Sequence, residues 1–135
     1  MTDPGFAVPT GTIGAADLRV LVEGDAPGLW VLDTRPRADY EAGHIPGALH
    51  CDVHELSKRE KELPPRGSTV VVVGGEGARG RAGAVFLVLA GYGGVRLLEG
   101  GFAAWTGAVE TGAGRPLSSA HPPKPKGWTD PPKRA

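Results

Sequence analysis

The central stretch of the chain reads Val70-Val71-Val72-Val73-Gly74-Gly75-Glu76-Gly77-Ala78-Arg79-Gly80-Arg81. Four valines in a row predict a short strand that is buried on both faces. The glycines that follow allow the backbone to turn tightly. An apolar helix is predicted over residues 81–90. Because backbone N–H groups converge where a glycine-rich loop meets a helix N-terminus, this arrangement favours the binding of an anion.

Hydrophobic strands and helices alternate on both sides of this stretch. Apolar runs predict strands at 12–13, 29–32, 48–51, 69–73 and 95–98. Helices are predicted to start at Gly14 and to cover 34–41, 52–63, 81–90 and 102–105. This alternation indicates an α/β fold with a mainly parallel sheet. Ligands of such folds bind beyond the carboxyl ends of the strands, where the loop after Val73 lies.

A length of 135 residues fits one domain. Residues 1–9 are predicted to be a flexible N-terminal arm and residues 10–110 the domain. The proline-rich, basic tail 111–135 has too few aliphatic side chains to form a core, so we expect it to be disordered or draped on the surface. Trp128 in this tail is either an anchor or an exposed aromatic residue.

Charge and hydropathy narrow the class of partner. The formal net charge is zero, which predicts no general attraction to nucleic acid or to membrane surfaces. The longest apolar run, 82–91, is too short to span a bilayer, which needs about 20 residues. The first ten residues lack the basic and apolar regions of a secretory signal. We therefore expect a cytoplasmic protein.

Three landmarks follow one another along the chain. They are Leu32-Asp33-Thr34-Arg35 with Tyr40-Glu41-Ala42-Gly43-His44-Ile45-Pro46-Gly47-Ala48, then Val70–Arg79, then Leu98-Glu99-Gly100-Gly101-Phe102-Ala103-Ala104-Trp105. In their order and spacing, these landmarks resemble the rhodanese-like family over residues 12–108. The resemblance implies a five-stranded, mainly parallel sheet flanked by helices on both faces. It also implies a loop that holds a cysteine persulfide, in enzymes that move sulfane sulfur from thiosulfate to a thiophilic acceptor. Asp33 is predicted to brace this loop, and His44 and Pro46 to shape a turn.

The nucleophile of the family is missing from this loop. The family pattern Cys-x-x-Gly-x-Arg-Ser reads here with Gly74 in place of cysteine and Gly80 in place of serine. Glycine has no side chain that could form a persulfide, so no catalytic residue is predicted. The loop length still matches that of the sulfurtransferases rather than that of the related phosphatases. The predicted anion-binding loop consists of Gly74, Gly75, Glu76, Gly77, Ala78, Arg79 and Gly80, with Arg35 and Arg81 as possible rim residues.

Cys51 is the single cysteine, which excludes a disulfide within the chain and a cysteine-based zinc cluster. It is interpreted as a small buried hydrophobic residue, with a substitute nucleophile as the alternative. His50, Asp52 and His54 beside it are residue types that bind metals. Because the run crosses a predicted strand-to-helix turn, these side chains are expected to diverge. No metal or cofactor is predicted.

Three functions follow from these observations. The favoured hypothesis is a rhodanese-like binding or regulatory module without sulfur transfer, whose partner is a sulfur-carrier or sulfur-transfer protein. The second is a sulfurtransferase that uses Cys51 or a cysteine of a partner protein. The third is a docking protein that acts through the tail 111–135.

Overall fold

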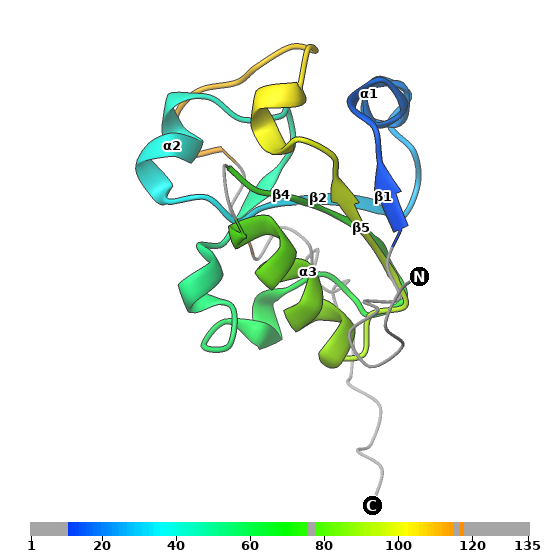
Figure 1. The fold of residues 1–135 in the computed structure, drawn as a ribbon, viewed down its shortest axis with the longest axis vertical. Coiled ribbons are helices and arrows are strands. Elements are labelled where there is room, and N and C mark those ends of the chain that lie inside the picture. Colours follow the sequence, from blue (N-terminus) through cyan, green and yellow to red (C-terminus); the bar gives the residue numbers. More distant parts are fainter. Residues whose placement is uncertain (1–10, 76–77, 115–116, 118–135) are drawn as a thin grey trace, which may run out of the picture.

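The structure is a computed structural model that describes residues 11–75, 78–114 and 117 (Figure 1). The predicted N-terminal arm, Glu76, Gly77 and Trp128 lie outside the described residues, as does most of the predicted tail.

The centre of the molecule is a parallel sheet of five strands in the order β1-β5-β4-β2-β3. The strands are β1 (Gly11–Ile13), β2 (Leu29–Asp33), β3 (Leu49–His50), β4 (Thr69–Val73) and β5 (Gly94–Leu98). β4 lies in the middle, and its four valines are fully buried, as the valine run predicts. The predicted α/β class and the five-stranded parallel sheet are therefore confirmed.

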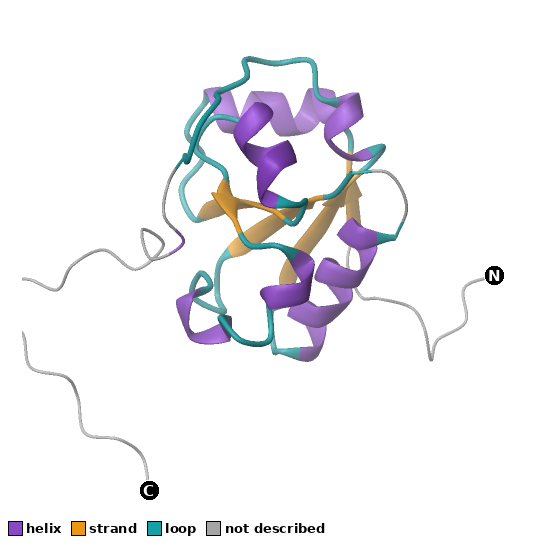
Figure 2. Cartoon of the chain, turned by 90° about the vertical axis from the view of Figure 1, so that its left-hand side faces the viewer, coloured by secondary structure: helices purple, strands orange, loops and turns teal. Residues whose placement is uncertain are grey.

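Helices cover both faces of this sheet (Figures 1 and 2). One face carries α1 (Ala15–Glu23), α2 (Arg37–Ala42) and the 3₁₀ helix η3 (Gly101–Ala104). The other face carries α3 (Arg79–Leu89) and the 3₁₀ helices η1 (Val53–Glu55) and η2 (Glu60–Glu62). Each face has its own buried hydrophobic cluster, which is the arrangement expected for strands that read as continuous apolar runs. Within the described part of the chain, none of the helices has the length and apolar content needed to cross a bilayer.

The predicted helix over 52–63 is wrong. The segment instead forms the two short turns η1 and η2. Asp52 does cap the first turn, since its side chain accepts a hydrogen bond from the His54 N–H at 2.9 Å. Residues 57–62 carry no apolar side chain that would hold a continuous helix against the sheet, which explains why the helix does not form.

The helix predicted from Thr34 begins later, at Arg37. Thr34 is fully buried, and its Oγ1 donates to the backbone oxygen of Val73 at 3.0 Å instead of capping the helix. This bond ties the end of β2 to the end of β4, directly beneath the predicted loop.

The end of the domain is a returning segment, residues 108–114, which we call the strap. Glu110 and His44 form an antiparallel bridge with two backbone hydrogen bonds of 2.8 and 2.9 Å. Beyond the strap, Leu117 is 3% exposed and belongs to the same hydrophobic cluster as Leu49 and Cys51. The packed part of the chain thus extends past the predicted boundary at residue 110.

Candidate functional site

The predicted loop starts at the carboxyl end of β4 and leads into α3. Of its seven predicted residues, the structure describes five, and it places them beside the turn between β5 and η3. A pocket of about 430 Å³ lies there. It is lined by Gly74, Gly75, Ala78, Gly80, Arg81, Leu97, Leu98, Gly100 and Gly101. The pocket therefore occupies the edge of the sheet where parallel α/β folds bind ligands.

The backbones of Gly74 and Gly80 touch each other at the mouth of this loop. A Cβ atom on Gly74 would lie 2.6 Å from both the N and the Cα of Gly80, closer than real Cβ contacts allow. A Cβ atom on Gly80 would in turn lie 3.0 Å from the Cα of Gly74. Residue 74 can therefore carry a side chain only if the start of α3 moves away.

Gly101, the first residue of η3, packs against the backbone of Gly74 as well. Its φ of +65° is a left-handed conformation that favours glycine, and a Cβ atom there would lie 2.5 Å from the carbonyl oxygen of Gly74. The next residue, Phe102, donates its N–H to that same oxygen at 2.9 Å. We call Gly74, Gly80 and Gly101 the glycine triad, three backbones packed where no side chain fits.

Two arginines bring positive charge to the start of α3. Nη1 of Arg79 pairs with Oδ1 of Asp52 at 3.1 Å, so its charge is shared with a carboxylate. Arg81 is exposed, lines the pocket, and has no ion pair among the described residues. Among the described residues, no side chain caps the N-terminus of α3, and its first turn holds no acidic residue. These features leave a positive electrostatic potential at this end of the helix.

Arg35, the other predicted rim residue, is a structural residue in this fold. It is 7% exposed, and its Nε and Nη2 donate to the carboxylate of Asp33 at 2.7 to 3.1 Å. Nη2 also donates to the Gly43 carbonyl oxygen at 2.6 Å, and the guanidinium lies 4.1 Å from the ring centroid of Phe102. Asp33 thus braces the loop indirectly, through an arginine that supports Phe102 and lies close to Gly75.

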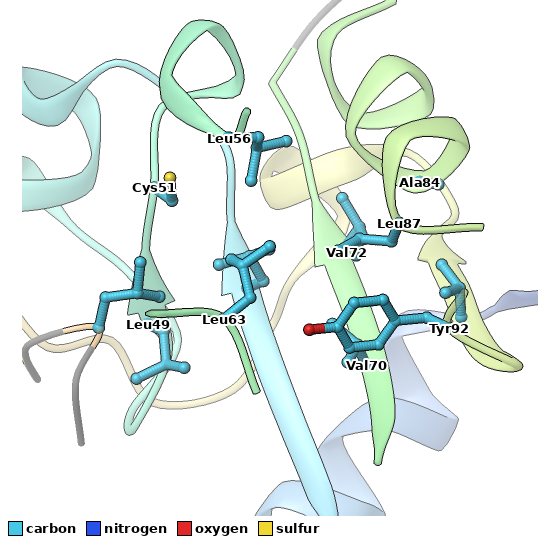
Figure 3. Packing of buried hydrophobic residues seen from close by; sticks show 12 residues of the cluster. Leu49, Cys51, Leu56, Leu63, Val70, Val72, Ala84, Leu87 and Tyr92 are labelled. Atoms are coloured by element: carbon cyan, nitrogen blue, oxygen red, sulfur yellow. The ribbon is translucent and has the colours of Figure 1, made fainter. Parts of the chain in front are cut away.

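Cys51 is buried in the cluster between the sheet and η1, where Figure 3 shows its sulfur near Leu56. Its side chain has no solvent access, and burial raises the pKa of the thiol to about 11. The charge of nearby Arg59 opposes this shift only in part. The thiol is therefore protonated at neutral pH, whereas a nucleophile or a metal ligand must be a thiolate. The interpretation as a buried hydrophobic residue is confirmed.

A buried aromatic cluster beside α2 escaped the sequence analysis. The rings of Tyr40 and His44 stack with centroids 3.9 Å apart, and the ring of His50 lies 4.7 Å from that of Tyr40. The two histidines donate to the backbone oxygens of Tyr40 and Arg35, both at 2.7 Å. The sequence signals were weak, since His44 lies in the predicted turn and His50 lies within the predicted strand 48–51.

The potential metal ligands near Cys51 do not lie together in the structure. His50 is buried against Arg35, while the carboxylate of Asp52 is engaged by Arg79 and by the backbone of His54. Across residues 11–75, 78–114 and 117, no three potential ligands lie together as a metal site would require.

Comparisons with known proteins agree with this architecture. The rhodanese-like domain family matches residues 15–108. A thiosulfate sulfurtransferase GlpE from Pseudomonas fluorescens is 36% identical over 93 residues, which are 66% of this chain and 83% of that protein. A sulfurtransferase from Allochromatium vinosum is 35% identical over 81 residues, 60% of this chain and 75% of that protein. The solution structure of the rhodanese-like domain of the Alr3790 protein from Anabaena sp. superposes with a TM-score of 0.64 at 26% identity and covers 92% of both chains. The chain therefore belongs to the rhodanese-like domain family, together with proteins named as sulfurtransferases.

Proposed function

We propose that the chain is a rhodanese-like binding or regulatory module that performs no sulfur transfer of its own. One observation carries the proposal. Gly74 stands where the family resemblance expects the nucleophilic cysteine, and the backbone of Gly80 occupies the space that a side chain there would need. Sulfur transfer requires a thiolate that attacks the sulfane sulfur of the donor and holds it as a persulfide. The loop offers no such group.

Cys51 does not replace the missing nucleophile. Its thiol is buried and protonated, and it has no glycine-rich loop of its own to stabilise a persulfide anion. A donor such as thiosulfate would have to enter the hydrophobic cluster under η1 to reach it. The alternative function, a sulfurtransferase that uses Cys51, therefore has little structural support.

The loop of residues 74–80 is proposed to receive a small anion. The N-terminus of α3, where Ala78 provides no side-chain cap, presents the N–H groups of its first turn, and Arg81 supplies a cation at the pocket. A ligand held in this way would bind reversibly, because no residue of the loop described here can form a covalent bond with it. The proposed protein partner is a sulfur-carrier or sulfur-transfer protein, in line with the sulfurtransferases among the relatives. A cytoplasmic location and a docking role of the tail remain predictions.

The direct test is a thiosulfate-to-cyanide transfer assay on the full chain, with an active thiosulfate sulfurtransferase as the positive control. The expected rate equals the uncatalysed background. A rate comparable to that of the positive control would overturn the proposal. In that case the variant Cys51→Ser tests whether Cys51 is the nucleophile, since loss of transfer in this variant assigns the activity to Cys51.

Mass spectrometry of the intact protein gives an independent readout. After treatment with thiosulfate, we expect no gain of a sulfur atom, because the single thiol is buried. A gain of one sulfur atom that is absent in Cys51→Ser would support the alternative function.

Gly74→Cys tests the loop rather than the assignment of function. Since the new Cβ would collide with Gly80, we expect this variant to be less stable than the wild type and to gain little transfer activity. Robust activity in the variant would show that α3 can move to admit a side chain.

A further inference from the structure

The strap covers a buried histidine that the proposed function does not use. His44 has no solvent access, and its Nδ1 lies 2.7 Å from the carbonyl oxygen of Tyr40. A carbonyl only accepts hydrogen bonds, so Nδ1 carries the proton. Nε2 then carries a buried lone pair, and it has no hydrogen-bond partner in the described part of the chain. Oε1 of Glu110 in the strap lies 3.8 Å from Nε2.

The strap is held in place mainly by its backbone. Besides the His44–Glu110 bridge, the N–H of Gly112 donates to the carbonyl oxygen of Glu41 at 2.8 Å. The carboxylate of Glu110 accepts from the Gly47 N–H at 3.3 Å. Gly114, with a φ of +63°, lies directly against the Tyr40 hydroxyl and Nε2 of His44. Opening the strap would therefore expose the histidine ring to water.

Burial and exposure of His44 favour different protonation states. With the strap open, water solvates the imidazolium. With the strap closed, a second proton on Nε2 would place a charge in a site without water, which is strongly unfavourable unless a counter-charge lies beside it. Glu110 supplies that counter-charge, and its side chain is 55% exposed.

The other groups around His44 do not take this role. Tyr40 stacks on the ring and donates its hydroxyl to Ala48. His50 lies beyond Tyr40. Arg35 reaches the neighbouring Gly43 carbonyl, but its charge is neutralised by Asp33. Among the described residues, Glu110 is the carboxylate that faces Nε2.

We propose that His44 and Glu110 form a pH-dependent latch for the strap. Above the range in which His44 titrates, the strap is held by its backbone bonds and by the Glu110–Gly47 and Trp105–Ala108 hydrogen bonds. Below this pH range, the buried, protonated His44 and the partly exposed Glu110 form an ion pair that keeps the strap closed. Without the glutamate, acid would open the strap, because the buried imidazolium would then lack a counter-charge.

The test compares amide hydrogen exchange in the wild type with that in Glu110→Gln between pH 8 and pH 5. This range covers histidine titration and keeps glutamate ionised. Glutamine retains an oxygen that can accept from Gly47, so only the charge is lost. The readouts are the protection factors of the Glu110 and Gly112 amides, which lie in the strap. Glu55→Gln is the matched control, since Glu55 is exposed and has no ion pair in the described part of the chain.

At pH 8 we expect the same protection in all three proteins. At pH 5 we expect the strap amides of Glu110→Gln to lose about two- to fivefold protection relative to the wild type, the range of one partly exposed charge pair. Glu55→Gln should follow the wild type throughout. A ratio between wild type and Glu110→Gln that stays constant from pH 8 to pH 5 would overturn the latch.

The ring nitrogens of His44 provide a second measurement that does not depend on the strap amides. In ¹⁵N spectra, the midpoint of the His44 titration should fall to lower pH in Glu110→Gln, and it should not move in Glu55→Gln. An equal midpoint in all three proteins would also overturn the proposal.

Discussion

The carboxyl edge of the sheet contains two regions of opposite character. At the end of β4, the glycine triad packs backbone against backbone, and the pocket beside it is open to solvent. At the ends of β2 and β3, the side chains capable of chemistry are Asp33, Arg35, His50 and Cys51, and all of them are buried. Among the described residues, the accessible region thus presents no nucleophile, whereas the single thiol, Cys51, lacks access to solvent. If the proposed non-catalytic function is right, these buried residues maintain the family fold rather than a reaction.

Among the substitutions considered, Asp33→Asn should lower stability the most, because it removes the buried ion pair between Asp33 and Arg35. The substitution leaves the guanidinium of Arg35, which is 7% exposed, without its counter-charge. We expect the free energy of unfolding to fall by about 3–5 kcal/mol, measured by urea denaturation.

The control for this prediction is Glu23→Gln, which breaks the exposed Arg19–Glu23 pair on α1. An exposed i,i+4 pair contributes about 0.3–0.5 kcal/mol. If Asp33→Asn cost no more than Glu23→Gln, the buried pair would not be the brace that the geometry indicates.

Gly74→Ala tests the close backbone contact in the accessible region, and we expect an intermediate loss of stability. Its methyl group would overlap the backbone of Gly80, so α3 must shift or the loop must distort. We expect a loss of about 1–3 kcal/mol in the free energy of unfolding. Gly67→Ala is the matched control, because a Cβ atom there meets nothing within 4 Å. It should change stability by less than about 0.5 kcal/mol. Equal effects of the two substitutions would show that the glycine contact is not tight.

Cys51 has the smallest effect near neutral pH, because its contribution to stability changes only under alkaline conditions. The pKa of its thiol rises from the ordinary value near 9.0 to about 11 in the folded state. Between these values the folded chain retains a proton that the unfolded chain loses, so stability declines as pH rises from 9 to 11. Cys51→Ala should remove this part of the decline in urea denaturation series. At pH 8 the native thiol should also resist iodoacetamide, which should react readily once the chain is unfolded. Fast alkylation of the native chain would contradict the burial.

Most of the fold could be predicted from the sequence because its signals are local. The valine run of β4, the glycine-rich loop and the alternation of strands with helices each arise from a few neighbouring residues. The position of the loop beside the pocket follows from the parallel topology. Asp52 as a cap and Cys51 as a buried residue also follow from local patterns.

The features that could not be predicted depend on how the elements pack against one another in three dimensions. Gly80 touches Gly74 only because α3 packs onto β4, and the pattern of glycines alone does not contain that distance. Arg35 reads as a rim cation until Asp33 and Phe102 are brought around it. Leu117 stands alone in a polar, proline-rich tail, and its burial follows from the strap that carries the chain to the core.

The burial of Leu117 has a consequence for how the chain matures. The bridge between His44 and Glu110 is a contact between distant parts of the chain, and such contacts form late in folding. During synthesis, the hydrophobic cluster around Leu49 stays incomplete until residue 117 has been added. A protease that cuts between residues 110 and 114 would likewise detach this leucine from the domain. Cleavage of the carboxyl-terminal region would thereby shorten the lifetime of the whole protein, by raising the population of open states that proteases degrade.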